Sequence, residues 1–241
     1  MELEGFAKEE QFASNPILSQ NFSLEKVTLY ANLALELLHE APDNAAEYAN
    51  SALLLRDSIA SDPVGEKAIT LRDNIYDCMG VLLRAYRDNA LNSGEVKSLD
   101  ELAVKRAEGG VSEKAIQMRQ LDPSRFDAYS FESSFWNRLG TIELQMGQNE
   151  NLPEKRRKLL VVRSHEHFEK SRELQETAVS KVKSQISSFQ EELRSNQLNP
   201  ELASRISDLE KQMADIVPKL SLIRENISFT EQILKSLEDK P

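Results

Sequence analysis

From Leu202 onward, apolar residues recur at alternating steps of four and three, the spacing of a buried helical stripe. The positions of this C-terminal seam are Leu202, Ile206, Leu209, Met213, Ile216, Leu220, Ile223, Ile227, Thr230, Leu234 and Leu237. All but Thr230 are apolar, so the pattern predicts one long helix. Pro218 lies within the seam and predicts a kink, because proline lacks a backbone donor and clashes with the preceding turn. Such a seam is typical of a partner-binding helical protein rather than an enzyme.

The same periodicity, interrupted by Gly, Pro and Asn, predicts helices along the rest of the chain. Their expected ranges are 23–40, 43–60, 64–92, 99–108, 112–121, 131–147 and 153–194. Asn199 is expected to cap the final helix, with Pro200 at its first position. Strand-like alternation is absent, so the fold class is all-α. Residues 1–23 are expected to form a loose N-terminal arm, because Asn15-Pro16 interrupts any helix there.

The last two helices are expected to form an antiparallel hairpin. The helix over 153–194 carries a second stripe with the same spacing, and the connection to the final helix is short. The residues of this stripe are Val179, Val182, Ile186, Phe189 and Leu193. The seam extends beyond this partner stripe by its C-terminal half, from Ile223 to Leu237. That half is expected to cover helices that precede residue 150.

A shared template on three helices indicates stacked helix pairs. The matches are Tyr30-x2-Leu33-Ala34-x2-Leu37, Tyr76-x2-Met79-Gly80-x2-Leu83 and Trp136-x2-Leu139-Gly140-x2-Glu143. The small residue allows a partner helix to approach closely, and the bulky neighbours fill the groove. The template resembles the first helix of a tetratricopeptide repeat, and Ser164-x3-Phe168-x2-Ser171 resembles the second. The irregular spacing leaves open a generic helical bundle.

These features divide the chain into three parts. Residues 1–23 form the arm, and 24–175 form a tetratricopeptide-like array with a flexible insertion at 94–130 around Gly109-Gly110. Residues 176–241 form the C-terminal hairpin with its capping helix.

The C-terminal region resembles the nuclear autoantigenic sperm protein family of histone chaperones. The segments that carry this resemblance are FWNRLGTIEL, HEHFEKSRELQ and ISDLEKQMADIVPKLSLIRENI, together with YDCMGVLLRAYRDN near the second repeat. The family's capping helix has an aliphatic-aliphatic-Pro-charged-aliphatic step, which Ile216–Leu220 matches. The resemblance implies an interrupted tetratricopeptide array that binds histones H3–H4 in the nucleus, on chromatin. One departure is that residues 93–131, where the family is strongly acidic, hold 7 acidic and 6 basic side chains.

Most of the net charge of −10 lies at the N-terminal end. Residues 1–66 hold 12 acidic and 3 basic side chains, whereas 151–241 hold 15 and 16. An acidic surface argues against direct binding to nucleic acid and favours a basic protein partner. The alternative is that the charge only maintains solubility.

Candidate chemistry is sparse along the sequence. Cys78 lies on an apolar helix and is expected to be a buried core thiol, as suits a reducing compartment. His165 and His167 lie two apart on one helix, so their imidazoles point in different directions and are not expected to share a metal. Gly109-Gly110 lacks the context of a phosphate loop. The sequence therefore indicates no catalytic, cofactor-binding or metal-binding residue, and it leaves the partner-binding residues unknown.

Localisation signals are equally few. The basic run Lys155–Lys158 is either a nuclear import signal or a solvated first helical turn. The N-terminus does not have the pattern of a secretory signal, and no segment is apolar enough to span a membrane. The expected location is therefore nuclear or cytoplasmic.

The favoured interpretation is a non-enzymatic chaperone without cofactors, whose acidic helical scaffold binds basic segments of histones H3–H4. The alternative is a tetratricopeptide-like adaptor that binds a non-histone peptide. A third interpretation is a homodimer formed through the C-terminal seam.

Overall fold

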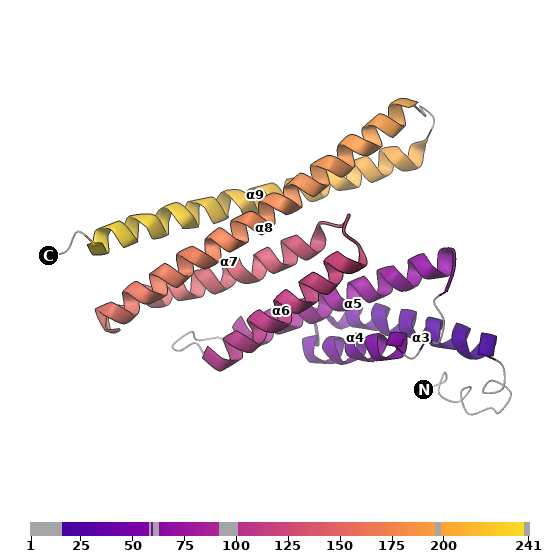
Figure 1. Cartoon of the computed structure of the whole chain (residues 1–241), viewed down its shortest axis with the longest axis horizontal. Helices are drawn as coiled ribbons and strands as arrows, with labels where there is room; N and C mark the ends of the chain where they lie inside the picture. Colours follow the sequence, from indigo (N-terminus) through magenta and orange to yellow (C-terminus); the bar gives the residue numbers. More distant parts are fainter. Residues whose placement is uncertain (1–15, 58, 60–62, 92–100, 196–198, 239–241) are drawn as a thin grey trace. The chain divides into compact units, whose positions relative to one another are not determined.

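The computed structural model describes residues 16–57, 59, 63–91, 101–195 and 199–238; most of these residues are helical, and none of them forms a strand. The helices are α3 (Pro16–Leu37), α4 (Pro42–Asp57), α5 (Glu66–Leu91), α6 (Glu101–Leu121), α7 (Asp127–Gly147), α8 (Glu154–Ser195) and α9 (Pro200–Glu238) (Figure 1). The predicted all-α class is confirmed. The chain divides into two compact units, Met1–Tyr86 and Arg87–Pro241, and the division falls within α5.

The first unit begins with an antiparallel pair of helices, α3 and α4. The expected helix start at Ser23 is wrong, because α3 already begins at Pro16. Proline is tolerated in a first helical turn, where its missing N–H has no partner to lose. The predicted arm is therefore helical over 16–23, and its residues 1–15 lie outside the described part of the chain. The two helices contact each other, and both bury small side chains: Ala31, Ala34, Ala45, Ala49 and Ala52.

Cys78 lies on α5 and is completely buried, so the prediction of a core thiol is confirmed. Burial, and to a smaller extent the charge of Asp77, raises the pKa of the Cys78 thiol to about 12. Only the thiolate reacts with disulfide reagents. We therefore expect Ellman's reagent to modify the native protein far more slowly than the urea-unfolded chain, at any pH near neutrality. Immediate release of one equivalent of thionitrobenzoate from the native protein would contradict this burial.

In the second unit, α6 corrects the sequence interpretation. Two short helices separated by Gly109-Gly110 were expected, but α6 is one helix that continues through both glycines. A glycine inside a helix costs about 1 kcal/mol relative to alanine. The buried stripe along α6 offsets that cost; it consists of Val104, Ala107, Val111, Ala115 and Met118. Residues 101–121 of the expected flexible insertion are thus a packed helix, whereas 92–100 lie outside the described residues.

Helices α7 and α8 approach each other closely along a row of small residues. Ser133, Gly140 and Gly147 recur every seven residues on α7, so they share one face of the helix. The Ser133 hydroxyl donates to the backbone carbonyl of Ser171 (2.9 Å), and the Ser171 hydroxyl donates to that of Ser133 (2.8 Å). The Ser164 hydroxyl donates to the carbonyl of Gly140 (2.7 Å). Side-chain to main-chain bonds between two helices require the backbones to lie close together.

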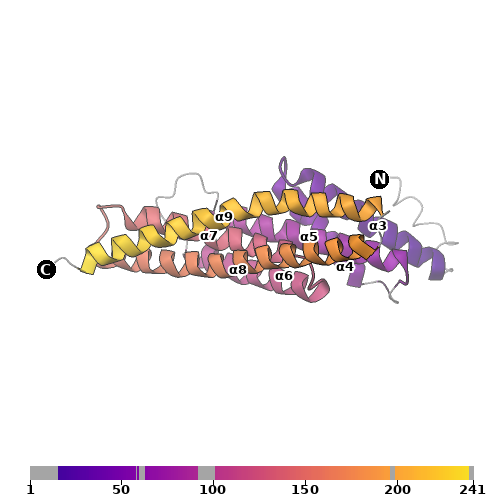
Figure 2. The ribbon, with the colours of Figure 1, turned by 90° about the horizontal axis from the view of Figure 1, so that it is seen from above.

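Helix α9 runs antiparallel to α8 and crosses it at a shallow angle (Figures 1 and 2). Every position of the C-terminal seam is buried or half-buried, which confirms the predicted stripe. Asn199 caps α9 as predicted: its side-chain oxygen accepts from the backbone N–H of Glu201 (3.1 Å) and of Leu202 (3.3 Å). The helix continues through Pro218, whose ring is exposed.

The seam packs against α8 over more of its length than the sequence suggested. Near the hairpin connection, Ile216 and Leu220 join Val179 and Val182 in one cluster, as expected. Farther along, Ile223 and Ile227 pack on Phe168 of α8 and on Leu144 of α7. The expectation that the C-terminal half covers helices before residue 150 is thus correct for Leu144. It is incomplete because α8 itself continues beneath this half.

Candidate functional site

The second unit contains a buried polar cluster centred on Glu143 of α7. The side chain of Glu143 is completely buried. Its Oε2 lies 2.6 Å from Nδ1 of His167, and its Oε1 lies 2.8 Å from Nη2 of Arg163, an ion pair without the alignment of a hydrogen bond. Both partners come from α8. The cluster therefore links α7 to α8 through a paired charge, whose burial is costly unless the pairing is kept.

Trp136, about two helical turns before Glu143 on α7, extends this cluster. The His167 ring lies 5.1 Å from the Trp136 ring, and Lys170 Nζ lies 3.6 Å from the Trp136 ring centre. Because Lys170 is exposed, such a cation–π contact is worth about 0.5–1 kcal/mol. The Trp136 indole also points its N–H towards Glu132, whose other oxygen accepts from Arg119 of α6 at 2.7 Å. The cluster thus holds three helices together.

The sequence interpretation missed the role of Glu143. It assigned Glu143 to the position of a large residue in the repeat template, next to Leu139 and Gly140. The available signal was a carboxylate on the same helical face as Trp136 and Leu139, where an apolar residue would be usual. Because every charged group of this cluster that the structure describes has a partner within the chain, we assign the cluster to the scaffold.

The histidines lie as the sequence predicted. His167 faces Glu143 on α7, whereas His165 Nδ1 lies 3.0 Å from Oγ1 of Thr230 on α9. The two imidazoles therefore contact different helices, which confirms that they point in different directions. Within the described residues, no group of three His, Cys, Asp or Glu side chains is placed to hold a metal ion.

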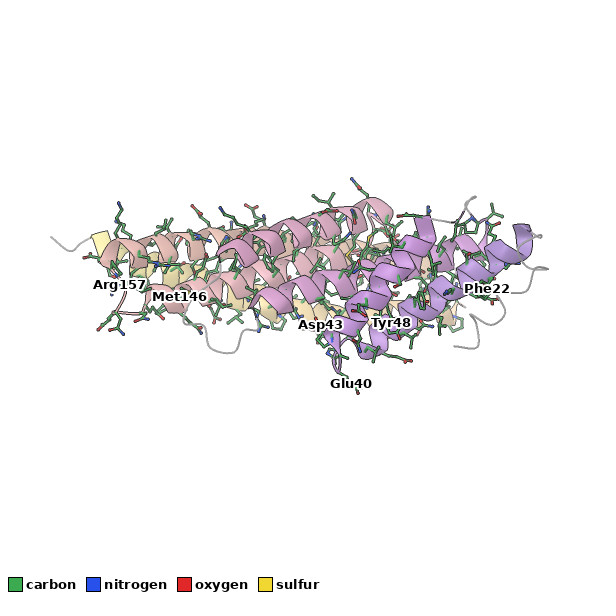
Figure 3. All side chains as sticks on the ribbon, turned by 90° about the horizontal axis from the view of Figure 1, so that it is seen from below. Phe22, Glu40, Asp43, Tyr48, Met146 and Arg157 are labelled. Atoms are coloured by element: carbon green, nitrogen blue, oxygen red, sulfur yellow. The ribbon has the colours of Figure 1, made fainter. Side chains whose placement is uncertain are left out.

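Exposed carboxylates gather around the turn between α3 and α4. Glu36 lies in the last turn of α3, Glu40 in the connection, and Asp43 and Glu47 in the first two turns of α4. Figure 3 labels Glu40 and Asp43 at this turn. We call these four residues the acidic turn. All four are exposed, and within the described part of the chain their carboxylates make no ion pair or hydrogen bond.

The hairpin that carries the acidic turn is itself acidic. Residues 16–57 hold six acidic side chains and two basic ones, a net charge of −4. Part of the negative charge predicted for the N-terminal end therefore lies on exposed side chains of α3 and α4. Exposed, unpaired carboxylates attract a basic surface and can form ion pairs with it.

The basic run Lys155–Lys158 forms the beginning of α8. Lys155, Arg156 and Lys158 are exposed, and Arg157 is half-buried. The run is therefore helical and solvated, and the import function stays a prediction.

None of the described helices combines the length and the apolarity needed to cross a bilayer. Comparison of the chain with protein-family models, with curated proteins and with solved structures gives no match.

Proposed function

We propose that this protein is a non-enzymatic histone chaperone, which binds basic segments of histones H3–H4 through the acidic turn and the surrounding α3–α4 hairpin. The observation that carries the proposal is the group of exposed carboxylates at this turn, which have no partner among the described residues. Each can pair with a lysine or arginine of the partner at little cost in desolvation, because all of these groups remain near water. The mechanism is charge screening: the carboxylates replace nucleic acid as the counter-charge of the histone.

The architecture that we propose for this scaffold is tetratricopeptide-like. Helices α7 and α8 support it best, because Gly140 of the first-helix template lies against Phe168 and Ser164 of the second-helix template. A Cβ at Gly140 would lie 2.9 Å from the Phe168 ring. Close approach at the small residue is the physical basis of that repeat.

The alternative function, an adaptor for a non-histone peptide, has support of its own. Several leucines on α3 and α4 are exposed, among them Leu29, Leu35 and Leu54, and the last is 71% exposed. An adaptor of this kind would retain one dominant non-histone partner from native extract, and its binding would depend on these leucines rather than on salt.

The chaperone proposal predicts a specific loss of binding to immobilised H3–H4. We expect the variant Glu36→Gln, Glu40→Gln, Asp43→Asn and Glu47→Gln to weaken binding about tenfold at low salt. Four exposed pairs at a few tenths of a kcal/mol each amount to about 1.4 kcal/mol. Raising the salt concentration should weaken histone binding strongly in the wild-type protein and less in the variant. Salt screens the same ion pairs that the four substitutions remove.

The control removes the same number of charges elsewhere. Glu210, Asp215, Glu225 and Glu231 are exposed on α9, and the structure gives these side chains no ion pair with any described residue. Their amide variant should bind nearly as well as the wild type. Equal losses in the two variants would mean that net charge alone attracts histones, and no retention of histones even at low salt would contradict the proposal.

A further inference from the structure

A groove separates the N-terminal half of α3 from the beginning of α5 in the first unit. It has a volume of about 370 Å³, and its walls come from residues 21–28 and 66–71. Two hydrogen bonds join the same helices: Lys67 Nζ donates to Asn21 Oδ1 (2.8 Å), and Asn74 Nδ2 donates to Thr28 Oγ1 (2.8 Å). The groove is thus a hollow between two bonded helices.

The lining of this groove combines an apolar surface with hydrogen-bond acceptors. Leu71 is buried and Leu24 is half-buried, and they supply the apolar part. The hydroxyls of Thr28 and Thr70 donate to carbonyls of their own helices (both 3.1 Å), so neither is available as a donor to a ligand. Lys67 Nζ donates one hydrogen bond to Asn21 Oδ1, so this lysine is held at the wall of the groove.

The charged acceptors of the groove are Glu25 on α3 and Glu66 on α5. Both are exposed lining residues, and neither carboxylate has an ion pair or a hydrogen bond with another described residue. Carboxylates only accept hydrogen bonds when ionised. A fitting occupant therefore has an apolar stem, to cover the leucines, and a positively charged, donor-rich end.

We propose that this groove receives a lysine or arginine side chain of the bound basic protein. This inference rests on the proposed function and names a contact within it. The aliphatic stem packs on Leu24 and Leu71, while the cationic end lies between Glu25 and Glu66. Lysine and arginine are the side chains that bury a stem and keep a charged end near water. Lys67 opposes the incoming cation and limits its affinity.

The test uses three synthetic peptides in which glycine alternates with lysine, with diaminopropionic acid or with norleucine. Diaminopropionic acid keeps the charge and removes most of the stem, whereas norleucine keeps the stem and removes the charge. The readout is the NMR shift of the methyl groups of Leu24 and Leu71 in the full chain. We expect the lysine peptide to shift both leucines and to bind at least threefold more tightly than either analogue.

Equal binding of the lysine and diaminopropionate peptides would contradict the proposal that the groove receives a side chain, because it would show attraction by charge alone. Tighter binding of the norleucine peptide than of the lysine peptide would also contradict it, as would shifts elsewhere without shifts at Leu24 and Leu71.

Two variants complete the test. Glu25→Gln with Glu66→Gln should weaken binding of the lysine peptide severalfold, and Lys67→Gln should strengthen that binding. The matched control, Glu225→Gln with Glu231→Gln on α9, should change nothing. If histones bind but the methyl signals of Leu24 and Leu71 do not shift, this inference fails and the proposed function stands. If the groove binds lysine peptides but histones are not retained, the chaperone proposal fails.

Discussion

Replacing Ile223 by aspartate is expected to lower the free energy of unfolding of the second unit by about 4 kcal/mol. Ile223 is only 2% exposed and packs on Phe168, Leu144 and Ile227. The variant loses this apolar contact and places a carboxylate where it has no partner. Urea unfolding followed by circular dichroism gives the change, as a lower midpoint concentration of urea.

The adjacent residue provides the control. Leu222 is 51% exposed, so Leu222→Asp should change the stability by no more than about 0.5 kcal/mol. The same pair of variants tests the third interpretation, a homodimer formed through the seam. Because the seam is covered by α8, Ile223→Asp should destabilise the chain rather than dissociate a dimer. A well-folded Ile223→Asp protein whose mass in light scattering falls by half would contradict the hairpin packing.

Replacing Gly140 by valine is expected to destabilise the second unit by about 3 kcal/mol. Even a Cβ at Gly140 would lie 2.9 Å from the Phe168 ring and 3.1 Å from the backbone oxygen of Ser164. The ring cannot withdraw freely because Phe168 is fully buried, and the oxygen belongs to the helix itself. Helices α7 and α8 must therefore separate, which weakens the hydrogen bonds at Ser133 and Ser171.

Gly109 on α6 is the matched control for this variant. It also lies within a helix, but a Cβ there would meet no atom within 4 Å. Gly109→Val should therefore leave the stability unchanged or raise it by a few tenths of a kcal/mol, since valine has the higher helix propensity. Thermal unfolding by calorimetry distinguishes the two sites. Similar losses in both variants would mean that the close approach of α7 and α8 does not hold in solution.

The successful predictions came from features that depend on local physics. Asn199 caps α9 because a side-chain oxygen reaches N–H groups two and three residues ahead, and this needs no other part of the fold. The seam was visible because burial against any partner requires the same apolar spacing. Helix α6 was not predicted as one helix, since the cost of Gly109-Gly110 is local whereas the burial of Val111 and Met118 that offsets it is tertiary.

The candidate sites show the same division. The sequence showed that the N-terminal end is acidic, but it could not show which carboxylates are exposed and unpaired. Glu36 and Glu47 belong to different helices, and only the α3–α4 turn brings them to the same end of the hairpin. The groove between α3 and α5 depends on Leu24 and Leu71, which are far apart in the chain.

By itself, the sequence determined that this chain is all-α, that it ends in a long capped helix with a buried stripe, and that its negative charge lies near the N-terminus. Each of these follows from spacing, capping or composition, which are properties of neighbouring residues. Only the tertiary structure decided that α8 also packs beneath Ile223 and Ile227 of the seam and that Glu143 is buried with Arg163 and His167. Those outcomes depend on which pairs of helices pack together. The periodicity of a single helix indicates that one of its faces is buried, but it does not indicate which helix covers that face.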